Sequence, residues 1–304
     1  MNFAQLLFPD FSLILIGYLL CRLTPLNRKV WEPIESLVYF FLFPVLLFAS
    51  IVRTPLEWQS ATNMMTAGLA LGIAGIVLSY SVRYWPGFRG VVDTRLHAAS
   101  AQIGFRFNSF IVLALVDRIL GPEGLPLVAV LIGVCVPLFN VGAVYPMARH
   151  GKQGFLRELV RNPLIAATVS GLLANLLGFH IPDWLQPTTD RIGQAALALG
   201  LMAAGAGMQL GSMYASKRLG AALLAIKHLA QPVIALGIAV LWNLDPAQTM
   251  VLLLFSAVPT ASSCYVLAAR MGYNGPYVAG LVTLSTVLGM ASLSLAVGVL
   301  LPLR

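Results

Sequence analysis

A shift of 154 residues brings this 304-residue sequence into register with itself. Residues near the start and near the end of the first half match residues of the second half. They are Gly17 with Gly171, Leu19 with Leu173, Leu23 with Leu177, Pro33 with Pro187, 112–114 (Val-Leu-Ala) with 266–268, and 121–122 (Gly-Pro) with 275–276. Self-similarity at a fixed spacing is the sign of a duplicated architecture. The fold must therefore be one that two similar halves build together.

The composition indicates that the chain is surrounded by lipid. It is 59% hydrophobic and 10% charged, with a mean hydropathy of +0.85, whereas soluble domains carry about 25% charged residues. A helix of about 20 apolar residues crosses a bilayer core of about 30 Å. Ten stretches meet this requirement, and we number them as spans one to ten: about 5–22, 34–52, 64–83, 95–119, 125–148, 160–179, 189–211, 218–241, 247–270 and 276–301. We expect an all-α membrane protein with no enzymatic module.

Lys and Arg residues are distributed unevenly between the connections. Thirteen of the 19 fall at the odd-numbered connections, and four fall at the even-numbered connections and the termini. Because positive residues mark the cytoplasmic side, we expect a multi-pass protein of the cell inner membrane with both termini in the periplasm. The net charge of +8 is then orientation charge that contacts anionic lipid heads, and it requires no nucleic-acid partner.

Each half contains five spans, an odd number, so the second half enters the membrane upside down relative to the first. We therefore expect an inverted repeat of two five-helix halves, residues 1–150 and 151–304. In such folds two broken helices cross near the midplane, and their unpaired backbone ends form a site. The equivalent segments here are 104–114 in span four and 258–268 in span nine. Interrupted spans at matching places indicate a secondary transporter.

Both interrupted spans carry polar residues at membrane depth. Arg106 at the bilayer centre costs about 2.5–3.5 kcal/mol on insertion scales, so it must face the bundle interior, a cavity or a partner. Pro259 removes a backbone donor and frees a carbonyl. We expect a substrate site made of Asn108, Arg106, Ser109, Pro259, Thr260, Ser262 and Ser263. The alternative is that Pro259 merely kinks its helix and that Ser262 and Ser263 hydrogen-bond back to the backbone.

The sequence leaves the coupling ion open. None of the eleven acidic residues falls in the middle of a span, although Glu35 and Asp117 come close. His228 is the only mid-span histidine and is a candidate proton-linked group, with a purely structural role as the alternative. Lys227 is a second midplane cation, which either meets an anionic substrate or has a structural role. The scattered Cys and His residues lack metal-binding spacing, so we expect no metal and no cofactor.

Several short runs, in this order and spacing, resemble the auxin efflux carrier family over essentially the whole chain. The runs are 42–44 (Leu-Phe-Pro), 46–48 (Leu-Leu-Phe), 107–110 (Phe-Asn-Ser-Phe), 160–165 (Val-Arg-Asn-Pro-Leu-Ile), 171–173 (Gly-Leu-Leu), 181–182 (Ile-Pro), 257–259 (Ala-Val-Pro), 266–268 (Val-Leu-Ala) and 284–286 (Leu-Ser-Thr). The family includes bacterial permeases for organic acids such as malate and malonate, and the plant PIN-formed auxin exporters. It shares its general fold with the bile acid:sodium symporters.

The resemblance implies ten helices in a 5+5 inverted repeat with crossing broken helices in spans four and nine. Spans one, two, six and seven would form a scaffold, and spans three to five and eight to ten a transport domain with an elevator-like movement. Asn108 and Pro259 match crossover residues that meet the substrate carboxylate. Phe105 stands where many relatives have proline, so we expect a softer first break.

Three functions follow from these expectations. The first is a secondary transporter of a small organic anion, with membrane lipids and a second copy of the chain, as a homodimer, for partners. The second is a sodium-coupled symporter of the bile-acid type. The third is a membrane receptor that binds a ligand without transporting it. The sequence does not give the substrate, the direction of flux or the coupling ion.

We predict that reporter fusions placed after Arg304 and within residues 151–155 give opposite topology signals. The reason is the 13-to-four distribution of Lys and Arg residues between the two sides. A pair of fusions to alkaline phosphatase and to a fluorescent protein at each position measures this. A C-terminus in the cytoplasm would contradict the prediction and remove the inverted repeat with it.

Overall fold

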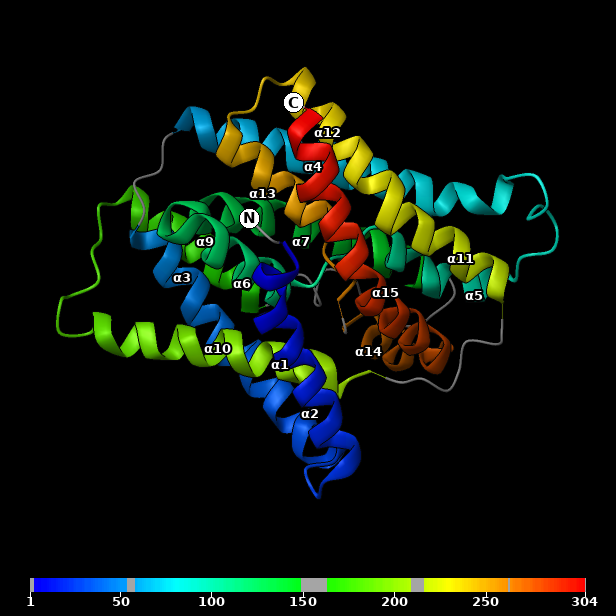
Figure 1. The fold of residues 1–304 in the computed structure, drawn as a ribbon, viewed down its shortest axis with the longest axis horizontal. Helices are drawn as coiled ribbons and strands as arrows, with labels where there is room; N and C mark the ends of the chain where they lie inside the picture. The colour runs from blue at the N-terminus through cyan, green and yellow to red at the C-terminus, as the bar shows by residue number, and fades with distance from the viewer. Residues whose placement is uncertain (1–2, 54–57, 149–162, 209–215, 262, 304) are drawn as a thin grey trace.

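The computed structural model describes residues 3–53, 58–148, 163–208, 216–261 and 263–303, and this part of the chain is helical without any β-strand (Figure 1). The helices are α1 (Phe3–Leu23), α2 (Arg28–Leu37), α3 (Phe43–Arg53), α4 (Trp58–Ser81), α5 (Thr94–Ser100), α6 (Ser109–Leu120), α7 (Gly124–Ala148), α9 (Pro163–Leu176), α10 (Gln186–Ala206), α11 (Lys217–Ala225), α12 (Gln231–Leu241), α13 (Pro246–Ala257), α14 (Ser263–Arg270) and α15 (Gly275–Leu295). The expected all-α class is confirmed.

Within the described residues, five continuous helical stretches are long and apolar enough to cross a membrane. They are Arg28–Arg53, Ala61–Tyr84, Gly124–Met147, Lys217–Leu241 and Gly275–Val299. Large apolar side chains point outward from several of them; Val77, for example, is 60% exposed. Many large apolar side chains exposed on long apolar helices are typical of a surface that faces lipid. The chain is a multi-pass membrane protein.

Two of the long stretches contain a five-residue π-helical segment, and a third ends within one; in such a segment each N–H bonds to the carbonyl five residues earlier instead of four. These segments are Val38–Leu42 between α2 and α3, Ile226–Ala230 between α11 and α12, and Ala296–Leu300 after α15. Segments of this kind are rare and often lie at functional sites. Two of them contribute to the site described below, through Tyr39, Lys227 and His228.

Two helices that start alike are interrupted midway. The helix that begins with α5 is capped by the Asp93 carboxylate, and α13 is capped by Asp245 in a reciprocal capping box with Gln248. The first helix continues as a 3₁₀ turn, ends at Gly104 and resumes as α6 at Ser109. The second ends at Ala257 and resumes as α14 at Ser263. Two of the acidic residues are therefore explained by helix capping.

Helices α1, α2, α3, α9 and α10 pack against one another, and α10 contacts α1, α2 and α3 (Figure 1). The α1–α10 contact is very close, because a Cβ at Gly205 would lie 1.8 Å from the Ile14 carbonyl oxygen and a Cβ at Gly17 would lie 1.9 Å from that of Met202. Glycine at both positions lets the two backbones touch. This is the small-residue packing that membrane helices use when no hydrophobic effect drives them together.

We predict that Gly205→Ala separates α1 from α10 and lowers stability by about 1–3 kcal/mol, since the added methyl group meets backbone and not a movable side chain. Gly237→Ala in α12 is the matched control, because nothing lies within 4 Å of its Cβ position and alanine favours the helix. Thermal unfolding in detergent measures both variants. Equal melting temperatures would show that the close contact is dispensable.

Candidate functional site

The two interruptions touch each other through their backbones. The Asn108 N–H donates to the Pro259 carbonyl oxygen at 2.7 Å, and Asn108 is only 3% exposed. The Asn108 side chain accepts a 3.3 Å hydrogen bond from the Ile111 N–H and so caps the start of α6. Asn108 is therefore held by both broken helices, at the point where they meet.

Thr260 joins the second interruption to the end of the first helix. Its hydroxyl donates to the Ile103 carbonyl oxygen at 2.6 Å, and a longer contact of 3.4 Å reaches that of Arg106. The Ile103 carbonyl lies in the last turn before the break, where no helical N–H follows to pair with it. A Cβ at Gly104 would lie 2.2 Å from the Ser79 hydroxyl oxygen, so glycine lets α4 come this near without displacing that hydroxyl. The first break thus forms without a proline, through tertiary contacts. A softer first break, expected from Phe105, stays a prediction.

His228 connects the two sides of the second interruption through two serines. The Thr260 N–H donates to the Ser285 hydroxyl at 2.9 Å, and the Ser292 hydroxyl donates to the Ala257 carbonyl oxygen at 2.7 Å. Each hydroxyl also lies 2.9 Å from a ring nitrogen of His228, Nε2 for Ser285 and Nδ1 for Ser292. Because the Ser292 proton goes to Ala257, Nδ1 is the nitrogen that donates, and Nε2 of a neutral ring accepts from Ser285. The chain of hydrogen bonds replaces the helical bonds that the break removes.

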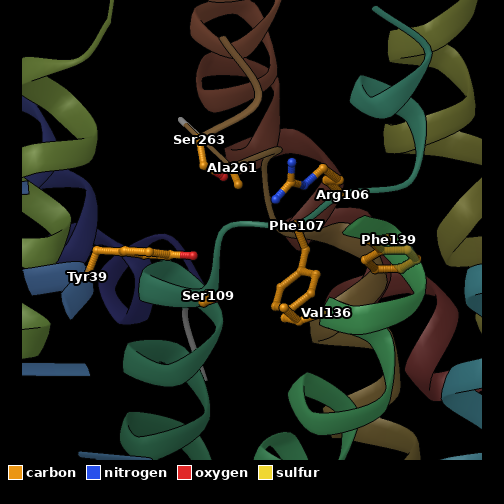
Figure 2. A pocket seen from close by; sticks show the side chains of 8 residues that line it. All are labelled: Tyr39, Arg106, Phe107, Ser109, Val136, Phe139, Ala261 and Ser263. Carbon is orange, nitrogen blue, oxygen red and sulfur yellow. The ribbon is translucent and has the colours of Figure 1, made fainter. Parts of the chain in front are cut away.

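A cavity of about 70 Å³ lies beside the meeting point, between the beginnings of α6 and α14 (Figure 2). Its lining residues come from the π segment after α2, both interruptions, the first residues of α6 and α14, and α7: Tyr39, Arg106, Phe107, Ser109, Val136, Phe139, Ala261 and Ser263. Figure 2 shows the polar ends of Arg106 and Tyr39 directed into the same space.

One wall of this cavity is aromatic. The Phe107 ring lies 6.0 Å from that of Phe139 and 4.2 Å from that of Phe255, measured between ring centroids. These rings exclude water and lower the local dielectric, which strengthens any charge interaction in the cavity.

Arg106 supplies positive charge at this site. Its guanidinium donates to the amide oxygens of Gln102 and Asn140, each at 3.1 Å, and it forms no ion pair with any acidic side chain in the described part of the chain. The cavity also faces the first residues of α6 and α14, Ser109 and Ser263, and helix N-termini carry partial positive charge. An anion is the ligand that this arrangement favours.

The structure brings some of the expected site residues together and separates others. Arg106, Ser109 and Ser263 line the cavity, while Asn108, Pro259 and Thr260 are buried beside it and hold the backbone. Ser262 lies outside the described residues. Lys227 and His228 are buried and do not line the cavity, so contact of Lys227 with substrate and a proton-linked role of His228 stay predictions.

Several residues of the site escaped the sequence analysis. Gln102 precedes Arg106 by four residues, a helical spacing that could have suggested contact. Asn140 is an amide inside an apolar span, and Ser285 and Ser292 stand two turns apart on one helix face; such buried polar groups seek partners across helices. For Tyr39 no signal is visible, because only tertiary packing brings the segment between α2 and α3 beside the interrupted helices.

The described residues contain no group of three or more His, Cys, Asp or Glu side chains placed to hold a metal ion.

Comparisons with known proteins agree on a class. A family model described as "Membrane transport protein" matches residues 146–297. The "Putative malonate transporter" of Rhizobium meliloti (strain 1021) is 22% identical over 304 residues, covering 95% of this chain and 93% of that protein. The "Uncharacterized transporter YfdV" of Escherichia coli (strain K12) is 23% identical over 278 residues, 87% of each chain. The relatives are named as transporters.

We predict that Thr260→Val, which keeps the side-chain volume, lowers stability by about 1–3 kcal/mol, because it leaves the buried Ile103 carbonyl without its donor. Thr286→Val is the matched control: Thr286 is also buried, but its hydroxyl bonds only to Val282 on its own helix. Thermal unfolding compares the two. A loss in Thr286→Val as large as that in Thr260→Val would contradict the special role of the bond between the two breaks.

Proposed function

Because this chain belongs to the auxin efflux carrier family of membrane transport proteins, we propose that it is a secondary transporter of a small organic anion, a carboxylate. The single observation that carries this proposal is the position of Arg106 and the neutral character of its partners. Its guanidinium faces a small cavity, and its described partners there are neutral amides. Arginine binds carboxylate through two parallel hydrogen bonds, and the neutral amides leave its charge for the substrate.

The size of the cavity supports a small substrate. Its 70 Å³ is several times the space that one water molecule needs, about 10–15 Å³, but far below the roughly 300–1,000 Å³ of sites for drug-sized ligands. A carboxylate of about three or four carbons fits this range. The name of the Rhizobium relative, a "Putative malonate transporter", is consistent with such a substrate.

We propose further that the chain has ten spans in a 5+5 inverted repeat, with the interrupted spans four and nine crossing at the site. Three features support this arrangement. The second parts of the interrupted helices begin at Ser109 and Ser263, which lie 154 residues apart, as do the repeated sequence motifs. Both interrupted helices start at an aspartate cap. The Asn108 N–H and the Pro259 carbonyl join the interruptions directly.

Alternating access by an elevator-like movement follows from the same proposal. Spans one, two, six and seven correspond to α1, α2 with α3, α9 and α10, and these helices pack as a group that would be the scaffold. Tyr39 reaches the cavity from this group, whereas Arg106 and Ser263 belong to the interrupted spans. Movement of the interrupted spans past Tyr39 would open the cavity to one side and then to the other. The inner membrane, periplasmic termini and a homodimer complete the proposal.

The proposal is tested by flux into proteoliposomes. We predict that malonate or a similar short carboxylate is taken up, and that Arg106→Gln lowers its affinity about ten- to a hundredfold, the loss of one charged hydrogen bond. Arg106→Lys, which keeps the charge but loses the planar fork, should cost less. Parallel assays with and without sodium and proton gradients identify the coupling ion.

Arg95→Gln is the matched control, because Arg95 does not line the cavity and instead lies over the Tyr273 ring. Unchanged uptake in a folded Arg106→Gln protein would contradict the anion site. Binding of carboxylates without flux in the unaltered protein would favour the receptor.

A further inference from the structure

Lys227 is the most completely enclosed charged side chain in the described residues. It is 2% exposed and lies in the π-helical segment Ile226–Ala230, in the middle of span eight. Among the described residues no Asp or Glu is buried, and no ion pair between them includes Lys227. The side chain instead donates from Nζ to the Ser256 carbonyl oxygen at 2.9 Å.

That carbonyl belongs to the broken end of α13. In an uninterrupted helix the Ser256 carbonyl would accept from the N–H of Thr260, four residues later. Here the Thr260 N–H donates to the Ser285 hydroxyl, and Pro259 has no N–H to offer. The break therefore leaves a buried acceptor at the Ser256 carbonyl, and Lys227 supplies its donor.

The same position carries negative electrostatic potential. The C-terminus of a helix bears about half a negative charge, and α13 ends at Ala257, one residue after Ser256. In a dry interior this partial charge is poorly screened, so a cation placed against the last carbonyls is favourable. The Lys227 Nζ donates the missing hydrogen bond, and its positive charge offsets the partial negative charge at the end of α13.

We propose that Lys227 is a tethered cation that closes the broken end of α13, at a position where a protein without this lysine would need a dissociable cation. It is a positioning residue: it holds the Ser256–Thr260 backbone so that the beginning of α14 faces the cavity. The structural role of Lys227 does not depend on the proposed function. One consequence does rest on it: anion binding requires no free sodium ion at this break.

The first test measures stability without any substrate, so its result does not depend on whether the protein transports carboxylates. Lys227→Met fills the same space without charge or donor. We predict that it lowers the melting temperature in detergent by about 3–6 °C, because the Ser256 carbonyl loses its partner. In other proteins, replacing buried charged residues by apolar residues of similar volume often leaves stability unchanged, so the measurement discriminates. A Lys227→Met protein as stable as the unaltered one would overturn the proposal.

The second test restores the cation from solution. Lys227→Ala leaves a cavity that ends at the Ser256 carbonyl, and ethylammonium has the charge of the deleted group and is one carbon shorter, so it fits this cavity. We predict that ethylammonium at about ten times its dissociation constant raises the melting temperature of Lys227→Ala by about 3–5 °C. Ethanol, which is neutral, and choline, which is too large, should leave it unchanged.

Matched controls separate this effect from general salt effects. Lys217→Ala removes an exposed lysine from the start of the same helical stretch and should show no shift with ethylammonium, as should the unaltered protein. A shift of equal size with ethanol would mean that the cavity needs only filling, and it would overturn the role of charge. If Lys227→Ala does not fold, the comparison of Lys227→Met with the unaltered protein decides the question alone.

Discussion

The structure depends on one constraint: a helix broken in the protein interior must still pair every backbone group that the break sets free. The breaks are buried away from water, so other parts of the chain must pair these groups. The two breaks first pair with each other, through the Asn108 N–H and the Pro259 carbonyl. The remaining groups are paired by side chains from neighbouring helices, with Thr260, Ser285 and Ser292 as examples.

The cavity beside Arg106 is a consequence of this pairing. Once the breaks are fixed against each other, α6 and α14 begin beside the same space. Arg106 lies in the first interruption, between the 3₁₀ turn that ends at Gly104 and the start of α6, and its side chain lines this space. Its guanidinium is oriented by the amides of Gln102 and Asn140. Neutral partners fix its direction and leave its charge available to an anion, whereas a carboxylate partner would have cancelled it. Positive potential is thus built from groups that the fold already requires.

The sequence points to this region but does not distinguish the roles of its residues. A polar residue inside an apolar span must find a partner or a cavity, so Arg106, Asn108, Thr260 and Lys227 were all visible as candidates. Which of them faces the cavity depends on side-chain direction. The interruptions change the helical phase at Gly104 and Ala257, and the π segment at Ile226–Ala230 changes it again. Helical periodicity counted along the chain therefore fails at the candidate site.

The sequence by itself determined the lipid environment, the helical class and the positions of the two interruptions, because composition, span length and an internal offset of 154 residues are properties of the chain alone. Only the tertiary structure decided that Tyr39 from the first half reaches the cavity, and that Lys227 turns to the Ser256 carbonyl. Both outcomes depend on how helices from distant parts of the chain pack against one another. Close contacts such as the one between Gly17 and Met202 belong to that packing, and no local pattern records them.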